Sequence, residues 1–385
     1  MAEDWEAGGF GLYLHWPFCE AKCPYCDFNS HVSRQIDQAA WCEAYLKELD
    51  RAATETSGRI LSSVFFGGGT PSLMAPETVA RVIEKIRASW PCINDLEITL
   101  EANPSSVEAG RFQAFRDAGV NRISMGIQAL NDSDLEKLGR LHTAQEAMAA
   151  FDIARNCFDR VSFDLIYARQ GQSLADWRAE LERALSMAVD HLSLYQLTIE
   201  QGTAFGDRYN AGKLRGLPDE DLSADLFSLT QDICDQHGLP AYEVSNHARD
   251  GAQSRHNLIY WRYGDYVGIG PGAHGRLSLD GHRWATECYA NPAQWLDVTS
   301  KGSGEKPRTR LSSDDQASEF LLMGLRLKEG LSMSRFTALK GAPLPRQKLD
   351  DLEELGLLTR EDGYLIILNQ GVMVLDAVIE ALLTD

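Results

Sequence analysis

The sequence predicts an α/β protein with a parallel sheet, followed by a small carboxyl-terminal domain of winged-helix type. Over its first two-thirds the chain alternates short β-rich segments with helical ones, as βα units do. Of its 385 residues, 44% are hydrophobic and 24% are charged, which is typical of a globular protein with a core. After about residue 314 the pattern changes to helices followed by a hairpin.

Six segments have the apolar and β-branched content of strands, and they are 10–16, 61–66, 96–100, 121–127, 161–166 and 191–197. The clearest helix between them is 173–188, with Ser173 as its N-cap. Its apolar side chains recur at helical spacing at Leu174, Trp177, Leu181, Leu185 and Ala188. The carboxyl ends of parallel strands share one face of a sheet, so functional groups are expected on the loops that follow the strands.

The strand and helix alternation stops after about residue 250. The glycine-rich segment 251–310 predicts irregular loop with short strands. A helix over 315–327, a helical stretch over 345–355, a turn at 361–363 and a strand over 364–368 then suggest the winged-helix domain. Glu361 and Asp362 at the tip of the wing favour a protein-contact or packing role over DNA binding.

Charge and hydropathy limit the partners. Lys and Arg number 37 against 56 Asp and Glu, so the formal net charge is −19. This excess argues against a nucleic-acid or anionic membrane surface, because phosphates need clustered cations. The amino terminus is acidic, and no apolar run reaches the ~18 residues of a transmembrane segment. The sequence therefore predicts a cytoplasmic protein that meets small molecules or other proteins.

Three of the eight cysteines stand close together, at Cys19, Cys23 and Cys26, directly after the first predicted strand. The other five are scattered as small buried residues usually are, at Cys42, Cys92, Cys157, Cys234 and Cys288. Three thiolates on one loop can converge on a metal centre. A [4Fe–4S] cluster held by three cysteines leaves one iron open for an exchangeable ligand. The alternative is a zinc site completed by a histidine such as His31.

Polar signals also follow the later strands. Glycines 67–69 and Thr70 form a turn whose backbone N–H groups are expected to approach an anionic ligand. The others are Glu101, Gln128, Arg140 and Asp164. Their common position at the carboxyl ends of parallel strands predicts one polar site.

The pattern Cys-x-x-x-Cys-x-x-Cys with Tyr25 before the last cysteine, together with Gly-Gly-Gly-Thr-Pro and Glu-x-Asn-Pro, resembles the radical S-adenosylmethionine (SAM) superfamily. Within that superfamily, the chain resembles the relatives of oxygen-independent coproporphyrinogen III oxidase. Among these relatives it is most similar to the heme-chaperone branch. The resemblance implies a partial (β/α)6 radical SAM barrel with its cluster and SAM site over 1–250. A linking segment over 251–310 and a small helical, winged-helix-like domain over 311–385 would follow.

By the same resemblance, Cys19, Cys23 and Cys26 ligate a [4Fe–4S] cluster, and S-adenosylmethionine occupies its fourth iron. Tyr13 and Tyr25 would lie beside that molecule, and Gly68, Gly69 and Thr70 would meet its amino-acid end. The remaining polar contacts would come from Glu101, Gln128, Arg140 and Asp164. Aromatic faces suit adenine, and carboxylates suit ribose hydroxyls.

The segment from His256 to Trp261 resembles the His-Asn-x-x-Tyr-Trp signature of the chaperone branch. A neutral imidazole is a common axial ligand of heme iron, so His256 is the first candidate. Three further candidates are His15, His247 and His274. On the residues alone, the alternative is that His256 caps a loop while the two aromatic rings fill core.

Two functions are compatible with the resemblance. The first is a heme chaperone that binds heme and transfers it to an acceptor protein of respiratory type, with homodimerisation left open. The second is a radical SAM oxidative decarboxylase of coproporphyrinogen III. Phe28, where the oxidases have a fourth cysteine, and the short segment before the first strand favour a chaperone without oxidase activity. A further departure is Ala-Arg-Gln-Gly at 168–171, where relatives show Gly-Leu-Pro-Gly.

Overall fold

The computed structural model describes residues 4–33, 35–187 and 190–383, so position 188 of the predicted helix and the extreme termini of the predicted domains lie outside it. Six parallel strands form the centre of the molecule: β1 (Phe10–Trp16), β4 (Leu61–Gly68), β5 (Cys92–Ala102), β6 (Arg122–Gln128), β7 (Arg160–Tyr167) and β8 (His191–Gln196). They coincide with the six predicted strands to within a few residues. Their side chains are buried on both faces, which explains their nearly continuous apolar sequences.

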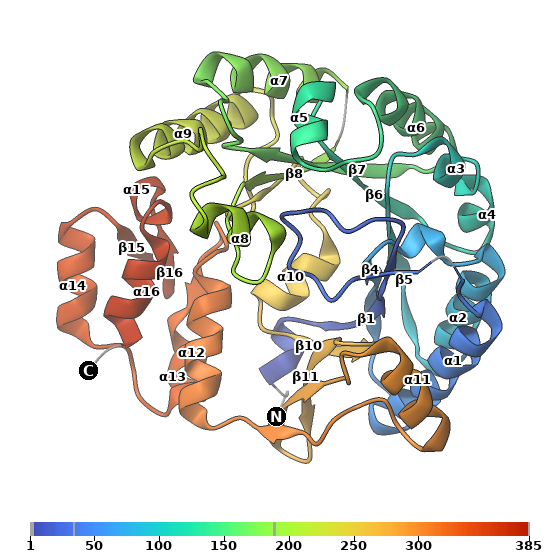
Figure 1. Ribbon diagram of the computed structural model, residues 1–385. Helices are drawn as coiled ribbons and strands as arrows, with labels where there is room; N and C mark the ends of the chain where they lie inside the picture. The colour runs from blue at the N-terminus through green and yellow to red at the C-terminus, as the bar shows by residue number, and fades with distance from the viewer. Residues whose placement is uncertain (1–3, 34, 188–189, 384–385) are drawn as a thin grey trace.

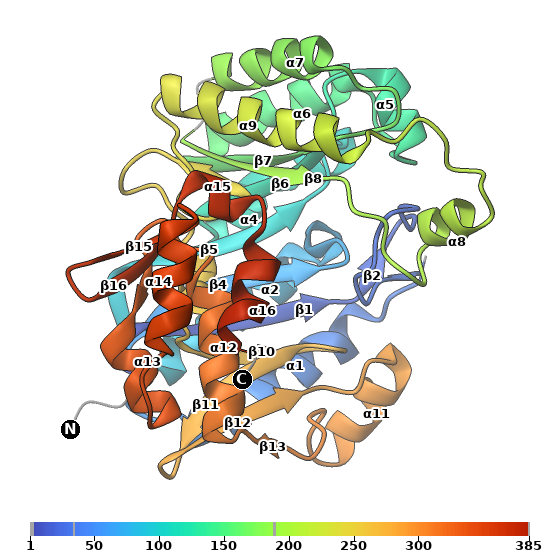
Figure 2. The same ribbon diagram turned by 90° about the vertical axis from the view of Figure 1, so that its left-hand side faces the viewer.

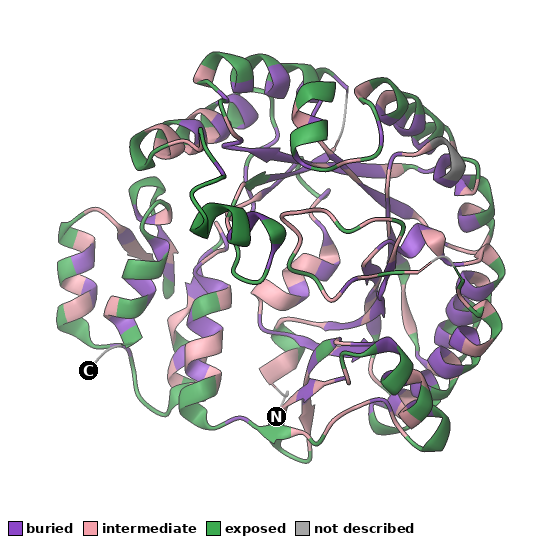
Figure 3. Cartoon of the chain, viewed as in Figure 1, coloured by how far each residue is buried: buried purple, intermediate pink, exposed green. Residues whose placement is uncertain are grey.

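Each of these strands is followed by a helix on the outside of the curved sheet (Figure 1). These outer helices are α1 (Gln38–Glu55), α2 (Pro76–Ser89), α4 (Phe112–Asp117), α6 (Ala144–Cys157), α7 (Leu174–Ser186) and α9 (Glu220–Gln236). Shorter helices are α3 (Ser106–Ala109), α5 (Asp132–Lys137) and α8 (Ala204–Asn210). The predicted cap of α7 is confirmed, because the Ser173 side chain accepts from Asp176 N–H. The exposed faces of these helices point outward and the strands are mostly buried (Figure 3). The predicted partial (β/α)6 barrel is therefore confirmed.

The segment 251–310 is more regular than predicted. It contains α10 (Arg255–Trp261), α11 (Pro292–Lys301) and four strands: β10 (Asp265–Ile269), β11 (His274–Leu279), β12 (His282–Glu287) and β13 (Thr309–Arg310). With β9 (Asn246–Ala248), these strands extend the sheet to 11 strands among the described residues, in the order β13-β12-β11-β10-β1-β4-β5-β6-β7-β8-β9. The expectation of mainly irregular loop is wrong.

Glycines in this segment permit close strand approach rather than disorder. A Cβ on Gly268 would lie 2.0 Å from the carbonyl oxygen of His274, so only glycine lets β11 fold back on β10 there. Asp280 and Gly281, with φ of 53° and 74°, form the two-residue turn between β11 and β12. Asp-Gly at such a turn is a hairpin signal that the sequence contained.

The carboxyl-terminal domain has a separate core, formed between α12 (Ser313–Gly324) and the elements that follow it. These are β14 (Leu331–Ser332), α13 (Met333–Lys340), α14 (Arg346–Glu354), β15 (Leu358–Glu361), β16 (Tyr364–Ile367), α15 (Asn369–Val372) and α16 (Leu375–Leu383). The strands pair in the order β14-β16-β15, and the β15–β16 hairpin turns at Asp362 and Gly363 as predicted. The winged-helix type is confirmed, and α12 lies beside α10. No helix in the described ranges has the length and apolarity needed to span a membrane.

Candidate functional site

The cysteine loop lies at the carboxyl ends of the parallel strands. It runs between two short parallel strands, β2 (Phe18–Cys19) and β3 (His31–Val32), which hold its ends side by side. Figure 2 shows β2 at the end of the sheet toward which β1 and β8 point. The N–H of Thr70 donates to the carbonyl of Phe18 at 2.8 Å and attaches the loop to the glycine turn. The loop therefore stands where parallel α/β folds build their sites.

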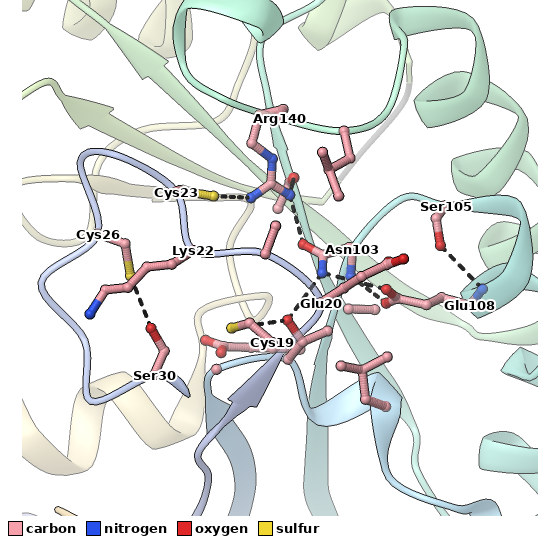
Figure 4. Close-up of a pocket in the computed structure, with 18 of the residues that line it drawn as sticks. Cys19, Glu20, Lys22, Cys23, Cys26, Ser30, Asn103, Ser105, Glu108 and Arg140 are labelled. Atoms are coloured by element: carbon pink, nitrogen blue, oxygen red, sulfur yellow. Dashed lines mark hydrogen bonds between the residues drawn. The ribbon is translucent and has the colours of Figure 1, made fainter. Parts of the chain in front are cut away.

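The three cysteines of this loop line one cavity of about 860 Å³. Their sulfur atoms face a common space between the loop and the strand ends (Figure 4). Each sulfur has its own polar partner: Thr70 Oγ1 donates to Cys19 Sγ at 3.5 Å, Arg140 Nη1 donates to Cys23 Sγ at 3.2 Å, and Ser30 Oγ lies 3.9 Å from Cys26 Sγ. All three thiols are free, so they are available as ligands.

The positions of the three thiols are compatible with a [4Fe–4S] cluster. Among the residues that the structure describes, no three His, Cys, Asp or Glu side chains are grouped to hold one metal ion. A [4Fe–4S] cluster offers each thiolate a separate iron atom, so its ligands need not converge on one point. His31, the alternative zinc ligand, is bonded instead to Asn29, with Nε2 3.1 Å from Oδ1. Burial raises the pKa of the Cys19 and Cys26 thiols, and bound iron would supply the positive charge that favours their thiolates.

The glycine turn does not present its N–H groups as expected. The N–H of Gly68 donates to Glu101 Oε2 at 3.2 Å, and the N–H of Gly69 donates to the carbonyl of Trp16 at 2.7 Å. The N–H of Thr70 donates to the carbonyl of Phe18. The expectation that these N–H groups are free for an anionic ligand is therefore wrong. The glycines serve close packing instead, because a Cβ on Gly69 would lie 2.7 Å from the Phe18 carbonyl oxygen. Gly68, Gly69 and Thr70 still line the cavity.

Two carboxyl groups of the cavity hold their protons unusually tightly. Burial, and then the nearby charge of Asp164, raise the pKa of Glu101 to about 8. Burial likewise raises the pKa of Asp164 to about 6, against opposing hydrogen bonds and cations. Both groups therefore change charge readily when a cationic ligand arrives, which is typical of functional sites.

Several buried polar atoms of the same cavity have no hydrogen-bond partner among the described residues. They are Gln128 Oε1, Arg140 Nε and Asp164 Oδ1. Gln128 also ends β6 in the left-handed region, with φ of 73°. Unpaired buried polar atoms are costly, so a polar ligand that pairs with them would relieve that cost. An amino acid joined to a nucleoside has the hydroxyl, amine and carboxylate groups that such a lining needs.

The structure separates the two tyrosines that the sequence analysis placed beside one ligand. Tyr25 lines the cysteine cavity and packs near Phe205, with ring centroids 6.3 Å apart. Tyr13 lines a second cavity instead, and its hydroxyl donates to His15 Nδ1 at 3.0 Å. Tyr13 therefore does not share the lining of the first cavity.

The second cavity has a volume of about 420 Å³ and lies between the sheet, α10 and α12. Its wall is largely aromatic: Tyr13, Phe28, Tyr260, Trp261, Tyr263 and Tyr266. It shares Phe28, Gly68 and Glu101 with the first cavity, so the two are neighbours.

His256 is placed behind this wall rather than in it. It is 1% exposed, and its ring stacks on Phe65 at a centroid distance of 5.0 Å. Nδ1 lies 2.8 Å from Ser63 Oγ and Nε2 lies 2.5 Å from Tyr260 Oη. Burial lowers its pKa to about 3, so the ring is neutral. Both nitrogens of the predicted heme ligand are thus engaged by the protein.

Sequence reasoning missed Asn103 and Glu108 as parts of the site. Asn103 Nδ2 donates to Thr70 Oγ1 at 3.1 Å, and its Oδ1 accepts from Arg140 Nη2 at 2.7 Å. Glu108 accepts from the Asn103 N–H at 2.7 Å (Figure 4). Asn103 stands in the Glu-x-Asn-Pro motif, which was therefore a usable signal. Glu108 lies in a short helix, and no motif in the sequence marked it as part of the site.

Arg169, the departure noted after β7, is a buried clamp. It is 3% exposed; its Nε donates to Asp134 Oδ2 at 3.1 Å, and its Nη2 donates to Glu180. Its Nη1 reaches the carbonyl oxygens of Ile166 and Gln128 at 2.6 and 3.4 Å. The guanidinium thus ties the ends of β6 and β7 to α5 and α7, beside the strand end that carries Gln128.

Comparison with known proteins agrees with this geometry. The Radical SAM superfamily model matches residues 13–184, and the HemN C-terminal domain model matches residues 311–374. The solved structure of coproporphyrinogen III oxidase (HemN) from Escherichia coli superposes with a TM-score of 0.81, covering 98% of this chain and 90% of that one at 22% identity. The fold and the site thus define a radical SAM protein. The likeness to the oxidase shows the fold alone, because one fold hosts many functions.

Relatives of higher identity define the family. The heme chaperone HemW of Escherichia coli is 37% identical over 379 residues, covering 97% of this chain and 98% of the relative. The mitochondrial radical S-adenosyl methionine domain-containing protein 1 of Bos taurus is 38% identical over 388 residues, covering 97% and 87%. The chain belongs to the family of these proteins, the HemW heme chaperones and their mitochondrial counterparts.

Proposed function

We propose that this protein is a heme chaperone, which binds heme and passes it to an acceptor protein while carrying a [4Fe–4S] cluster and S-adenosylmethionine. The observation that carries the proposal is the pair of neighbouring cavities, one polar and lined by three free thiols, the other aromatic. Full-length similarity to proteins named heme chaperones supports it.

In the first cavity, Cys19, Cys23 and Cys26 would hold the cluster. When bound, such a cluster supplies one-electron chemistry and an iron atom open to an exchangeable ligand. Arg140 lies against Cys23 and would offset the negative charge of the thiolates.

Glu101, Gln128, Asp164, Tyr25 and the glycine turn would hold S-adenosylmethionine. Gln128 Oε1 and Asp164 Oδ1 have unused acceptor capacity in the described part of the chain, which suits hydroxyl or amine donors of that molecule. Glu101 would release its proton as the cationic ligand arrives, because a nearby positive charge lowers a carboxyl pKa.

The second cavity would receive the heme. Aromatic side chains favour the flat apolar faces of a porphyrin. The acceptor would be an apo-protein of respiratory type, and the setting that we propose is the cytoplasm. All eight cysteines are free, as in proteins of reducing compartments.

Ferric heme titrated anaerobically into the cluster-reconstituted full chain tests the proposal, with the Soret band as readout. We expect saturation near one heme per chain. The loaded protein should then transfer heme to the apo form of a histidine-ligated heme protein. This transfer should be faster than the release of free heme from the loaded protein during dialysis without the acceptor. Binding that rises without saturation, or heme that stays on the chain when acceptor is added, would overturn the chaperone function.

A further inference from the structure

The second cavity holds one histidine that differs from every other candidate ligand. His274 is the first residue of β11, is exposed, and lines this cavity together with Tyr260, Trp261, Tyr266 and Met323. Within the described ranges its imidazole takes part in no hydrogen bond or ion pair. A heme iron needs an imidazole nitrogen with a free lone pair. His274 can supply one.

The other three candidate histidines cannot do so as they stand. Both nitrogens of His256 are engaged by Ser63 and Tyr260, and the ring is sealed behind the cavity wall. His15 lines the cavity, but its Nε2 donates to the Asn29 carbonyl at 2.9 Å, so its Nδ1 must be the acceptor for the Tyr13 hydroxyl.

His247 is excluded for a different reason. It is 0% exposed and does not line the second cavity. Its two ring nitrogens have no partner among the described residues, so the obstacle is access rather than occupancy. To reach heme, it would have to leave the core.

The backbone around His274 is held rigidly and close to the cysteine loop. Gly268 lets β10 and β11 approach, as shown above, and His274 pairs with Glu287 in β12. Asn29, three residues after Cys26, donates through Nδ2 to the carbonyls of Pro271 and Ala290, both at 2.8 Å. The turn before His274 is therefore fastened to the loop that carries the cluster ligands. A ligand residue on such a fixed strand is well preorganised.

The wall opposite comes from α10 and α12. His256 Nε2 and the Tyr260 hydroxyl are joined at 2.5 Å, and Tyr260 packs edge to face on Tyr266 at a centroid distance of 4.3 Å. His256 thus fixes Tyr260 from behind while Tyr260 faces the cavity. Arg276 and Glu319 of α12 form an ion pair at 2.8 Å on the same lining, so each charge has its partner within the wall.

We propose that heme binds in this second cavity with its iron ligated by the imidazole of His274, and that His256 is a positioning residue for Tyr260. The inference rests on the proposed heme-binding function and adds the place and the ligand. The chemical class of the ligand is an iron tetrapyrrole, whose apolar plane meets the aromatic rings while its metal meets the imidazole of His274.

The test compares four forms of the full chain in ferric heme titrations: the unaltered chain, His274→Gly, His256→Asn and His282→Ala. His282 is an exposed histidine on the same hairpin and outside the cavity, so it is the matched control. The readouts are the dissociation constant, the Soret maximum and the iron–imidazole stretching band of the reduced heme in resonance Raman spectra.

We expect His274→Gly to weaken heme binding by about 10- to 100-fold or more, since losing even a supporting partner of a metal ligand has that effect. The iron–imidazole band should vanish, and free imidazole should restore it by filling the space left by the side chain. His256→Asn should keep the band, and His282→Ala should match the unaltered chain.

The outcomes separate the two proposals. If the unaltered chain shows no saturable binding, the proposed function fails and this inference fails with it. If the unaltered chain binds heme and His274→Gly keeps both affinity and band, the inference alone is overturned. Loss of the band in His256→Asn but not in His274→Gly would also overturn it and would return the ligand role to His256.

Discussion

The two cavities are neighbours, yet they are built from different side chains. The first is lined by thiols, carboxyl groups and a guanidinium, several of them with unpaired buried atoms or raised pKa values. The second is lined mainly by aromatic rings, together with two histidines, His15 and His274, and three charged residues, Glu101, Arg276 and Glu319. A charged lining is suited to a polar ligand and responds to its charge, whereas an aromatic lining is suited to a flat apolar one. The difference predicts that a substitution outside the shared residues Phe28, Gly68 and Glu101 disables one cavity and leaves the lining of the other intact.

Removing one cluster ligand should have the largest effect. Cys23→Ala leaves two thiols for the cluster, so we expect it to lose the iron, the sulfide and the brown charge-transfer absorption after anaerobic reconstitution. Heme binding in the second cavity should remain saturable. Cys157→Ala, outside the cavity, is the control and should keep the cluster. A variant at Cys23 that keeps full iron and sulfide would contradict the ligand role.

Removing the Arg169 side chain, which lies beside the first cavity, should have the next largest effect, on stability. Arg169→Leu leaves Glu180, which is 9% exposed, without its main cationic partner, and breaking a buried ion pair costs about 3–5 kcal/mol. Urea unfolding measures this loss. Arg178→Leu, which removes an exposed pair on α7, should cost about 0–1 kcal/mol. Equal effects of the two changes would show that the clamp adds nothing.

The carboxyl groups of the first cavity should make stability depend on pH. Glu101 has a folded pKa of about 8 against an ordinary value of 4.5, so between these values the folded state keeps a proton that the unfolded state has lost. The free energy of unfolding should therefore fall as pH rises through this window, by a few kcal/mol in all, since one pKa unit is about 1.4 kcal/mol.

Glu101→Gln should flatten this slope, measured by urea unfolding at both ends of the window, because the amide does not titrate. The exposed Glu136→Gln on α5 is the control and should leave the slope unchanged. An unaltered slope in Glu101→Gln would show that its carboxyl group is not the source.

In the aromatic cavity, removing the hydroxyl of Tyr260 should lower the free energy of unfolding by a smaller amount. Tyr260→Phe keeps the ring but leaves His256 Nε2 without its partner, which should cost about 1–3 kcal/mol of unfolding free energy. Tyr364→Phe, on the exposed wing, should change stability by less than about 0.5 kcal/mol. Equal values for both would mean that the His256–Tyr260 bond does not support the wall.

The smallest expected change is a gain. Ala168 follows β7 with φ of 58°, a left-handed conformation that costs a residue with a Cβ about 1–2 kcal/mol. Ala168→Gly should therefore raise the midpoint of thermal unfolding slightly. Ala149→Gly on the exposed face of α6 should lower it by the equivalent of about 1 kcal/mol. A loss at position 168 would mean that the turn is not strained.

Much of the fold could be predicted because its signals are local. Alternating strand and helix patterns, the Ser173 cap and the turn at Glu361–Gly363 each depend on residues close in the sequence. The segment that contains β10 to β13 was predicted as irregular loop with short strands because its glycines suggested loop, although Asp280-Gly281 marked a hairpin. Those glycines are explained by a contact between strands that no single segment reveals.

The site was predicted less completely for the same reason. The residue types around the cysteine loop follow from motifs, but the use of each polar group depends on distant partners. Ser63, which engages His256, is 193 residues away in the sequence. The N–H of Gly69 is taken by Trp16 of a different strand. Whether a lone pair or an N–H is available depends on the tertiary structure. This availability is what distinguishes His274 from His256 as a candidate heme ligand.

The partition formed by Gly68 and Glu101 belongs to both cavities. Glu101 carries at most one negative charge, so two ligands that both contact it interact with the same single charge. If occupancy of one cavity alters affinity in the other, the coupling free energy must be equal in both directions. Heme release and cofactor binding would then be thermodynamically linked. The coupling could be measured either as the change in heme affinity when the cofactor binds or as the change in cofactor affinity when heme binds.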